Sequence, residues 1–153
     1  GPFPTELDNT TGNEIRDRAG EYGTTTGRAR RVGWFDGVAA RYSATVNDFT
    51  SIILTRLDIL DNFSSVKVCV AYDLDGQTVN HFPSNVDLLE RGLPVYKEVM
   101  GWDKPTAGVT RLEDLPEEAL AYVRLLEELI GYPISLISTG PHRHETIQVK
   151  ELI

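Results

Sequence analysis

The chain has 153 residues, of which 41% are hydrophobic and 25% are charged, and its net charge at pH 7 is −8. This composition is typical of one globular domain, and the acidic balance argues against a general nucleic-acid binder, which needs a basic face. The single cysteine excludes a disulfide within the chain, and no stretch is apolar for long enough to span a membrane.

Positive charge is concentrated near the start of the chain. Residues 1–41 hold six Lys or Arg and six Asp or Glu, whereas residues 42–153 hold nine against seventeen. The early basic residues are all arginines: Arg16, Arg18, Arg28, Arg30, Arg31 and Arg41. A local group of arginines in an acidic protein favours binding of a discrete small anion over binding of a long polyanion.

The first part of the chain predicts a long loop, a helix and a strand. Residues 1–27 are rich in Gly, Pro, Thr, Asn and Asp, and they predict loop structure with a short helix near residues 13–18. Apolar residues at helical spacing predict a helix over residues 34–47. The continuous apolar run of residues 51–55 predicts a short strand that is covered on both faces of its sheet.

The middle of the chain predicts a β-hairpin. A strand over residues 66–72, a turn at Asp75-Gly76 and a returning strand over residues 77–82 form it. Cys69 lies in the first of these strands and is expected to be a buried, unreactive side chain. A short helix over residues 85–91 then begins with Ser84 or Asn85 as its cap.

The last part predicts a strand over residues 95–100, a long helix over residues 116–130, and strands over residues 134–138 and 146–152. Asp114 is the predicted cap of the long helix, and Gly131 suits its end. We therefore predict an α/β fold, with a partly parallel sheet, flanking helices and a β-hairpin.

The segment Gly20–Arg31 is suited to binding an anion. It holds three successive threonines between glycines, followed by Arg28, Arg30 and Arg31. Glycine lets backbone N–H groups approach an anion closely, and arginine grips a carboxylate or phosphate with two parallel hydrogen bonds. A solvated basic loop is the alternative that the composition leaves open.

The segment Thr55-Arg56-Leu57-Asp58 follows a predicted strand. A carboxylate there can accept hydrogen bonds from both the ring N–H and the exocyclic amine of guanine, a donor pair that adenine lacks. The stem of the preceding cation can lie over the purine face. The pattern resembles the Asn/Thr-Lys-x-Asp signature of GTP-binding proteins, with Arg in place of Lys. An Asp that caps a following turn is the alternative.

The turn Ser138-Thr139-Gly140-Pro141 also follows a predicted strand, and its backbone N–H groups can reach a purine carbonyl. Because ligands of open α/β sheets gather at the carboxyl ends of strands, we expect this turn and Asp58 to converge on one purine. His142 and His144 lie just beyond, but two histidines without a third ligand make a poor metal site.

Taken in chain order, these segments resemble the adenylosuccinate synthetase family. Residues 1–7 read GPFPTEL, residues 20–31 read GEYGTTTGRARR, residues 33–36 read GWFD, residues 54–61 read LTRLDILD and residues 138–141 read STGP. The match covers essentially the whole chain. It implies that the chain is the C-terminal portion of a larger GTP-binding α/β fold, with more than half of the protein before Gly1.

The reaction that the resemblance implies joins L-aspartate to inosine monophosphate (IMP) in AMP biosynthesis, with GTP as co-substrate. The γ-phosphate of GTP moves to O6 of IMP, and the aspartate amine then displaces it. By motif position, the resemblance implies that one loop binds aspartate and IMP, with Arg28 reaching IMP. The residues of this loop are Thr24, Thr25, Thr26, Gly27, Arg28, Ala29 and Arg30. It assigns the GTP site to Arg30, Arg56, Leu57, Asp58, Ser138, Thr139 and Gly140.

The resemblance divides the chain into a substrate-loop region, residues 1–33, and a guanine-binding α/β region, residues 34–153. It places the family's catalytic residues and Mg²⁺ contacts before Gly1, so the fragment by itself is expected to be inactive. It also implies a cytoplasmic homodimer. Two alternatives are a non-catalytic guanine-nucleotide binding module and an unrelated carboxylate-binding protein that uses the arginines.

Overall fold

The computed structural model describes residues 1–20 and 30–149. These form two compact units, one of residues 1–38 and 67–97 and the other of residues 39–66 and 98–153. The functional division into residues 1–33 and 34–153 concerns ligands and stays a prediction.

The first unit opens with helix α1, Thr10–Ala19, which confirms and extends the predicted short helix. The Asn9 side chain begins it by accepting a hydrogen bond of 2.9 Å from the backbone N–H of Gly12. Gly20 ends it in the left-handed region at φ 66°, which glycine adopts without steric cost. The helix therefore has a local signal at both ends.

The sheet of the first unit is built around β3, Ser65–Leu74, which pairs with β1, Phe35–Asp36, with β4, Gln77–Val79, and with β5, Leu93–Met100. The predicted hairpin is confirmed, because β3 and β4 are antiparallel. Asp75 and Gly76 form its turn at φ 53° and 88°. Such a turn of two left-handed residues matches the twist of the strands that it joins.

The helix predicted over residues 34–47 begins later than expected. Phe35 and Asp36 pair in parallel with β3, opposite Val68 and Cys69, and helix α2 spans Gly37–Val46. The helical spacing of apolar residues was misleading at Trp34 and Phe35, because pairing with a distant strand overrides a local pattern. Helix α3, Val86–Arg91, begins as predicted with Asn85 as its cap.

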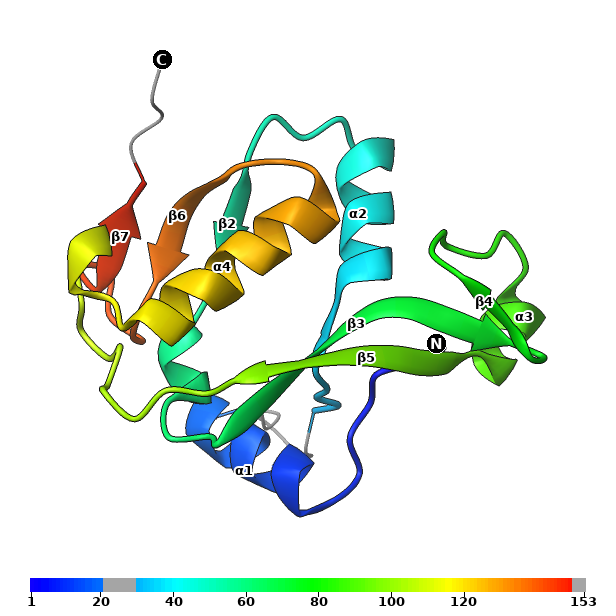
Figure 1. The fold of residues 1–153 in the computed structure, drawn as a ribbon, viewed down its shortest axis with the longest axis horizontal. Coiled ribbons are helices and arrows are strands. Elements are labelled where there is room, and N and C mark those ends of the chain that lie inside the picture. The colour runs from blue at the N-terminus through cyan, green and yellow to red at the C-terminus, as the bar shows by residue number, and fades with distance from the viewer. Residues whose placement is uncertain (21–29, 150–153) are drawn as a thin grey trace. The chain divides into compact units, whose positions relative to one another are not determined.

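The sheet of the second unit contains β2, Ile52–Leu54, β6, Ile134–Ser138, and β7, Thr146–Gln148, in the order β2-β6-β7. β2 and β6 are parallel and β7 is antiparallel to β6, and the arrows of β2 and β6 point the same way in Figure 1. Two short 3-10 helices, η1 at Leu57–Leu60 and η2 at Leu112–Asp114, lie in the connections. The predicted mixed α/β fold with partly parallel strands is confirmed.

Helix α4, Glu117–Ile130, packs its apolar face inward, with Ala119, Tyr122, Val123, Leu126 and Ile130 buried. Gly131 ends the helix in the left-handed region, as predicted, but Asp114 does not cap it. Asp114 belongs to η2, and the cap position is held by Pro116 without a side-chain hydrogen bond. In the part of the chain that the structure describes, neither α4 nor any other helix combines the length and apolarity that crossing a membrane requires.

Strand β2 is less covered than its apolar sequence predicts. Ile53 is 59% exposed, whereas the burial of Ile52 and Leu54 is intermediate. Phe49, just before the strand, is also exposed. The prediction of a strand covered on both faces is therefore wrong, because apolar side chains are exposed on β2 and just before it.

Alkaline pH is expected to destabilise the protein, partly through Cys69. Burial and the nearby charge of Asp36 raise the pKa of this thiol from 9.0 to about 12, so the folded state keeps the proton that the unfolded chain releases. Stability is therefore complete below pH 9 and falls as the pH rises toward 12. Between pH 8 and about pH 10.5, Cys69 alone should lower the free energy of unfolding by about 2 kcal/mol, measured by urea denaturation.

The matched variant for this prediction is Cys69→Ala, which should flatten part of the pH dependence. Burial also raises the pKa of Tyr96 to about 12 and raises the pKa of Tyr122, so a residual alkaline slope is expected in the variant. An identical slope in both proteins would contradict the role given to Cys69. The same thiol should react with thiol reagents at pH 8 only after unfolding.

Candidate functional site

Parallel pairing brings two distant turns to one edge of the second unit's sheet. Leu54, the last residue of β2, lies opposite Ile137 of β6. At the start of β2, Ile52 lies opposite Ile134, and the register shifts once, between Ile52 and Ile53. The hydroxyls of Ser51 and Ser135 also meet, at 3.1 Å. Because both strands run the same way, residues 55–58 and 138–141 leave the sheet at the same edge.

Arg56 and Asp58 form a two-pronged ion pair directly after β2. The Nε of Arg56 donates to Oδ1 of Asp58 at 3.0 Å, and its second guanidinium nitrogen donates to Oδ2 at 3.1 Å. Arg56 adopts φ 54° and ψ 55°, a left-handed conformation that is uncommon for a residue with a side chain. Both oxygens of the Asp58 carboxylate, which would receive a guanine edge, thus accept hydrogen bonds from Arg56.

Arg56 also interacts electrostatically with a residue that follows the 138–141 turn. Its pKa is raised first by the hydrogen bonds to Asp58, and the negative charge of Glu145 raises it further. Glu145 belongs to the segment that follows Ser138–Pro141, and its carboxylate lies against Gly140, where the Cβ of any other residue would overlap it. The two turns are therefore electrostatic neighbours as well as products of neighbouring strands.

The turn at residues 138–140 is held by its own hydrogen bonds. Thr139 is fully buried; its N–H donates to the carbonyl of Glu145 at 2.8 Å and its hydroxyl to the carbonyl of Val109 at 2.7 Å. The Ser138 hydroxyl donates to the Gly140 carbonyl at 3.1 Å. This network fixes the backbone of the turn, which is the part of it that could reach a ligand.

Burial limits what two of the predicted site residues can do. Leu57 is 1% exposed and Thr139 is 0% exposed, so a ligand contact by either would come from the backbone. The side chains of Arg56 and Asp58 are 26% and 13% exposed, so both are accessible at this edge. The structure thus brings Arg56, Asp58 and the 138–140 turn together, with Leu57 packed beneath them.

The predicted aspartate and IMP loop lies almost wholly outside the described residues. Thr24, Thr25, Thr26, Gly27, Arg28 and Ala29 fall in residues 21–29. Arg30 is described and exposed, and its carbonyl accepts a hydrogen bond of 2.8 Å from Nε of Arg16. Arg16 in turn donates to the side chain of Asn13 at 2.8 Å. Helix α1 therefore holds the backbone on which Arg30 is carried.

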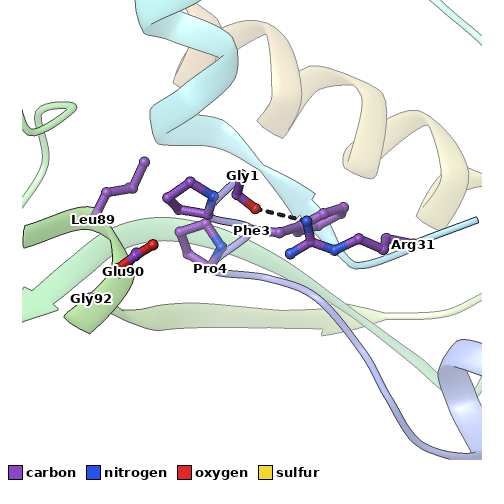
Figure 2. Close-up of a pocket in the computed structure, with 8 residues that line it drawn as sticks. Gly1, Phe3, Pro4, Arg31, Leu89, Glu90 and Gly92 are labelled. Atoms are coloured by element: carbon purple, nitrogen blue, oxygen red, sulfur yellow. Dashed lines mark hydrogen bonds between the residues drawn. The ribbon is translucent and has the colours of Figure 1, made fainter. Parts of the chain in front are cut away.

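Arg31 has a structural role that the sequence did not reveal. Its guanidinium donates to the Gly1 carbonyl at 2.7 Å and lies 5.3 Å from the centre of the Phe3 ring (Figure 2). The guanidinium also donates to the Glu6 carboxylate at 2.9 Å. The backbone N–H of Leu7 also donates to the Val32 carbonyl at 2.9 Å. These contacts tie residues 31–33 to residues 1–7.

An open cavity of about 390 Å³ lies beside Arg31 in the first unit, as Figure 2 shows. It is lined by Gly1, Pro2, Phe3, Pro4, Arg31, Leu89, Glu90 and Gly92. Arg31 belongs to the segment predicted to bind an anion, but the lining includes none of the residues assigned to GTP, IMP or aspartate. We therefore assign no ligand to this cavity.

The histidines fit the prediction of a loop. His142 and His144 are exposed, and their rings are stacked at 5.9 Å. Within residues 1–20 and 30–149, no group of three or more His, Cys, Asp or Glu side chains could hold a metal ion. Two residues that matter at the sheet edge were not identified as functional from the sequence. These are Glu145, for which no local pattern predicts a role, and Asp61, which lies in the motif at residues 54–61 but was given no role there.

Comparison with known proteins agrees with this architecture. The chain is a mixed α/β protein, and the family model for adenylosuccinate synthetase matches its residues 1–147. It therefore belongs to the adenylosuccinate synthetase family. The match confirms the resemblance seen in the sequence motifs.

Individual relatives show how much of the family's length the chain spans. The adenylosuccinate synthetase of Aquifex aeolicus is 50% identical over 153 residues, which are 100% of the chain and 35% of that protein. That of Streptococcus sanguinis is 53% identical over 146 residues, or 95% of the chain and 34% of that protein. A solved structure of fully ligated adenylosuccinate synthetase from Plasmodium falciparum matches with a TM-score of 0.91 at 34% identity, covering 98% of the chain and 36% of its own. The chain thus spans about a third of the length of these relatives.

Proposed function

We propose that this chain supplies the guanine-binding edge and the aspartate loop of a ligase that joins IMP to L-aspartate with GTP as co-substrate. The observation that carries the proposal is the convergence of Arg56, Asp58 and the 138–140 turn at one edge of a parallel strand pair. Family membership supplies the reaction. A non-catalytic module that binds guanine nucleotides by itself would instead bind GDP tightly without the rest of the protein.

Guanine recognition is assigned to Asp58. Its two carboxylate oxygens accept the ring N–H and the exocyclic amine of the base, after the Arg56 guanidinium has moved off them. Arg56 then lays its stem over the purine face, where its charge remains close to Glu145. A backbone N–H of the 138–140 turn, other than that of Thr139, which donates to the Glu145 carbonyl, approaches the purine carbonyl from the other side.

The acceptor substrates are assigned to the loop from Thr24 to Arg30. Its hydroxyls and guanidinium groups bind the aspartate carboxylates, Arg28 also contacts the IMP ribose, and Arg30 also lies near GTP. In the first step, N1 of IMP releases its proton, O6 bonds to the γ-phosphorus, the bond from that phosphorus to the bridging oxygen breaks, and GDP leaves. In the second step, the aspartate amine bonds to C6, phosphate leaves, and the amine loses a proton.

Mg²⁺, which the family's reaction implies, has no cluster of ligands among residues 1–20 and 30–149. We therefore assign no step to a metal on this chain. The division into a substrate-loop region (1–33) and a guanine-binding region (34–153) belongs to the same proposal. So do a cytoplasmic location and assembly as a homodimer.

The reaction is tested with the protein expressed from its complete reading frame. Formation of adenylosuccinate, followed by its ultraviolet absorbance, should require GTP, IMP and L-aspartate together, and ATP should not replace GTP. Omission of any one substrate is the control. Product formation without aspartate, or equal rates with ATP and GTP, would contradict the proposal.

Calorimetry with GDP on the 153-residue chain separates the ligase from the binding module. If the chain provides only base contacts, its dissociation constant should be weaker than about 100 μM. Submicromolar affinity would favour a module that binds the nucleotide by itself. Tight binding of dicarboxylates without any response to guanine nucleotides would favour the carboxylate-binding alternative.

A further inference from the structure

Asp61 is a buried carboxylate with an unusually full set of hydrogen bonds. It is 8% exposed, and it accepts from Nε1 of Trp102 at 2.7 Å and from the hydroxyl of Thr106 at 2.7 Å. The backbone N–H groups of Thr106, at 2.9 Å, and Ala107, at 3.2 Å, donate to its other oxygen. A buried carboxylate with this many donors is fixed in place, because moving it would leave buried polar groups without a hydrogen-bond partner, which is costly in free energy.

Asp61 is joined to the base-reading residue through the backbone. It follows η1, the 3-10 helix that begins at Leu57 and contains Asp58, and its N–H donates to the Asp58 carbonyl at 3.1 Å. The position of the Asp61 side chain therefore fixes the short helical turn on which the Asp58 carboxylate is carried.

The segment that Asp61 holds reaches the other half of the candidate site. Beyond Thr106 and Ala107, the N–H of Gly108 donates to the Thr139 carbonyl at 3.1 Å. The Thr139 hydroxyl donates to the Val109 carbonyl at 2.7 Å. Residues 102–109 thus lie as a brace between η1 and the 138–140 turn, anchored on Asp61 at one end and on Thr139 at the other.

We propose that Asp61 is a positioning residue that sets the spacing between Asp58 and the 138–140 turn, so that one guanine base contacts both. The inference rests on the proposed function of that edge and adds a residue to it. Asp61 touches no substrate; it acts through the turn that carries Asp58 and through the brace of residues 102–109. Guanine affinity and base selectivity depend on the spacing, whereas IMP and aspartate binding do not.

The test uses the protein from its complete reading frame, with kinetics for each substrate. Asp61→Asn replaces one acceptor oxygen by an amide that faces N–H donors, so the KM for GTP should rise about 10- to 100-fold. The KM values for IMP and aspartate should stay within about twofold. The ratio of kcat/KM for GTP to that for ITP, which lacks the exocyclic amine, should fall.

Thr106 variants keep the inference testable if Asp61→Asn does not fold. Thr106→Val removes only the hydroxyl donor and should raise the KM for GTP by a few-fold. Thr106→Ser keeps that donor, so its KM for GTP should equal that of the natural protein. Thr110→Val, at an exposed threonine just beyond residues 102–109, is the matched control and should leave the KM for GTP unchanged. A lower melting temperature with unchanged KM for GTP, or equal increases for all three substrates, would overturn the inference.

The outcome also separates this inference from the proposed function. If Asp58→Asn leaves the preference for guanine intact, the assignment of the guanine site itself fails. If Asp58→Asn changes the preference but the Asp61 and Thr106 variants do not affect GTP, only the positioning role fails.

Discussion

Asp58→Asn is expected to change the preferred base from guanine to xanthine. Guanine presents two adjacent donors, the ring N–H and the exocyclic amine, and a carboxylate accepts both. An asparagine amide offers one acceptor and one donor, which matches the ring N–H and the carbonyl oxygen of xanthine. In the protein from its complete reading frame, kcat/KM for GTP should fall about 100-fold or more. The ratio of kcat/KM for xanthosine triphosphate to that for GTP should rise.

The measurement is kcat/KM for both nucleotides at saturating IMP and aspartate. Asp114→Asn, at an exposed carboxylate in η2, is the control and should leave both values unchanged. Asp58→Asn also removes one acceptor of the Arg56 guanidinium, so a small loss of stability is expected beside the change in base selectivity. An unaltered preference for GTP would show that Asp58 does not read the base.

Gly101→Ala is expected to cause a large loss of stability. A Cβ at this position would overlap the Phe63 carbonyl oxygen, far inside van der Waals contact, and backbone atoms cannot move aside as a side chain can. The same stretch is held by the N–H of Gly101 to the Ser64 carbonyl at 3.0 Å and the N–H of Asn62 to the Trp102 carbonyl at 3.1 Å. The free energy of unfolding should fall by about 3 kcal/mol or more, measured by urea denaturation.

Gly131→Ala provides the comparison for this prediction. Gly131 has φ 82° but no heavy atom within 4 Å of a new Cβ, so the change tests backbone conformation without a clash. It should cost about 1 kcal/mol, clearly less than Gly101→Ala. Equal effects of the two substitutions would contradict the steric argument for Gly101.

Local signals in the sequence predicted most of the elements correctly. The hairpin at Asp75-Gly76, the start of α3 at Asn85 and the end of α4 at Gly131 each depend on residues within a few positions. The errors lie where distant residues decide the structure. Phe35 and Asp36 join a strand through pairing with β3, and the exposure of Ile53 depends on what covers the sheet.

In the candidate site, too, the sequence predicted the features that depend on nearby residues and missed those that depend on distant ones. The spacing of Arg56 and Asp58 and the position of the 138–140 turn after a strand predicted their convergence, because the carboxyl ends of parallel strands share an edge. The bonds of Asp61 to Thr106 and Ala107 span 45 and 46 residues, and no short motif encodes them. The roles of the loop from Thr24 to Ala29 stay predictions.

The hydroxyl contact between Ser51 and Ser135 joins residues 84 positions apart, and it has a consequence for biosynthesis. As a nascent chain leaves the ribosome, the strand that precedes Arg56 emerges long before its neighbour does. Closing so long a segment is entropically costly and slow, so a nucleotide could not assist the early stages of folding. Until β6 is made, the backbone N–H and C=O groups of β2 lack the strand that pairs with them, so this apolar segment is open to aggregation with other chains.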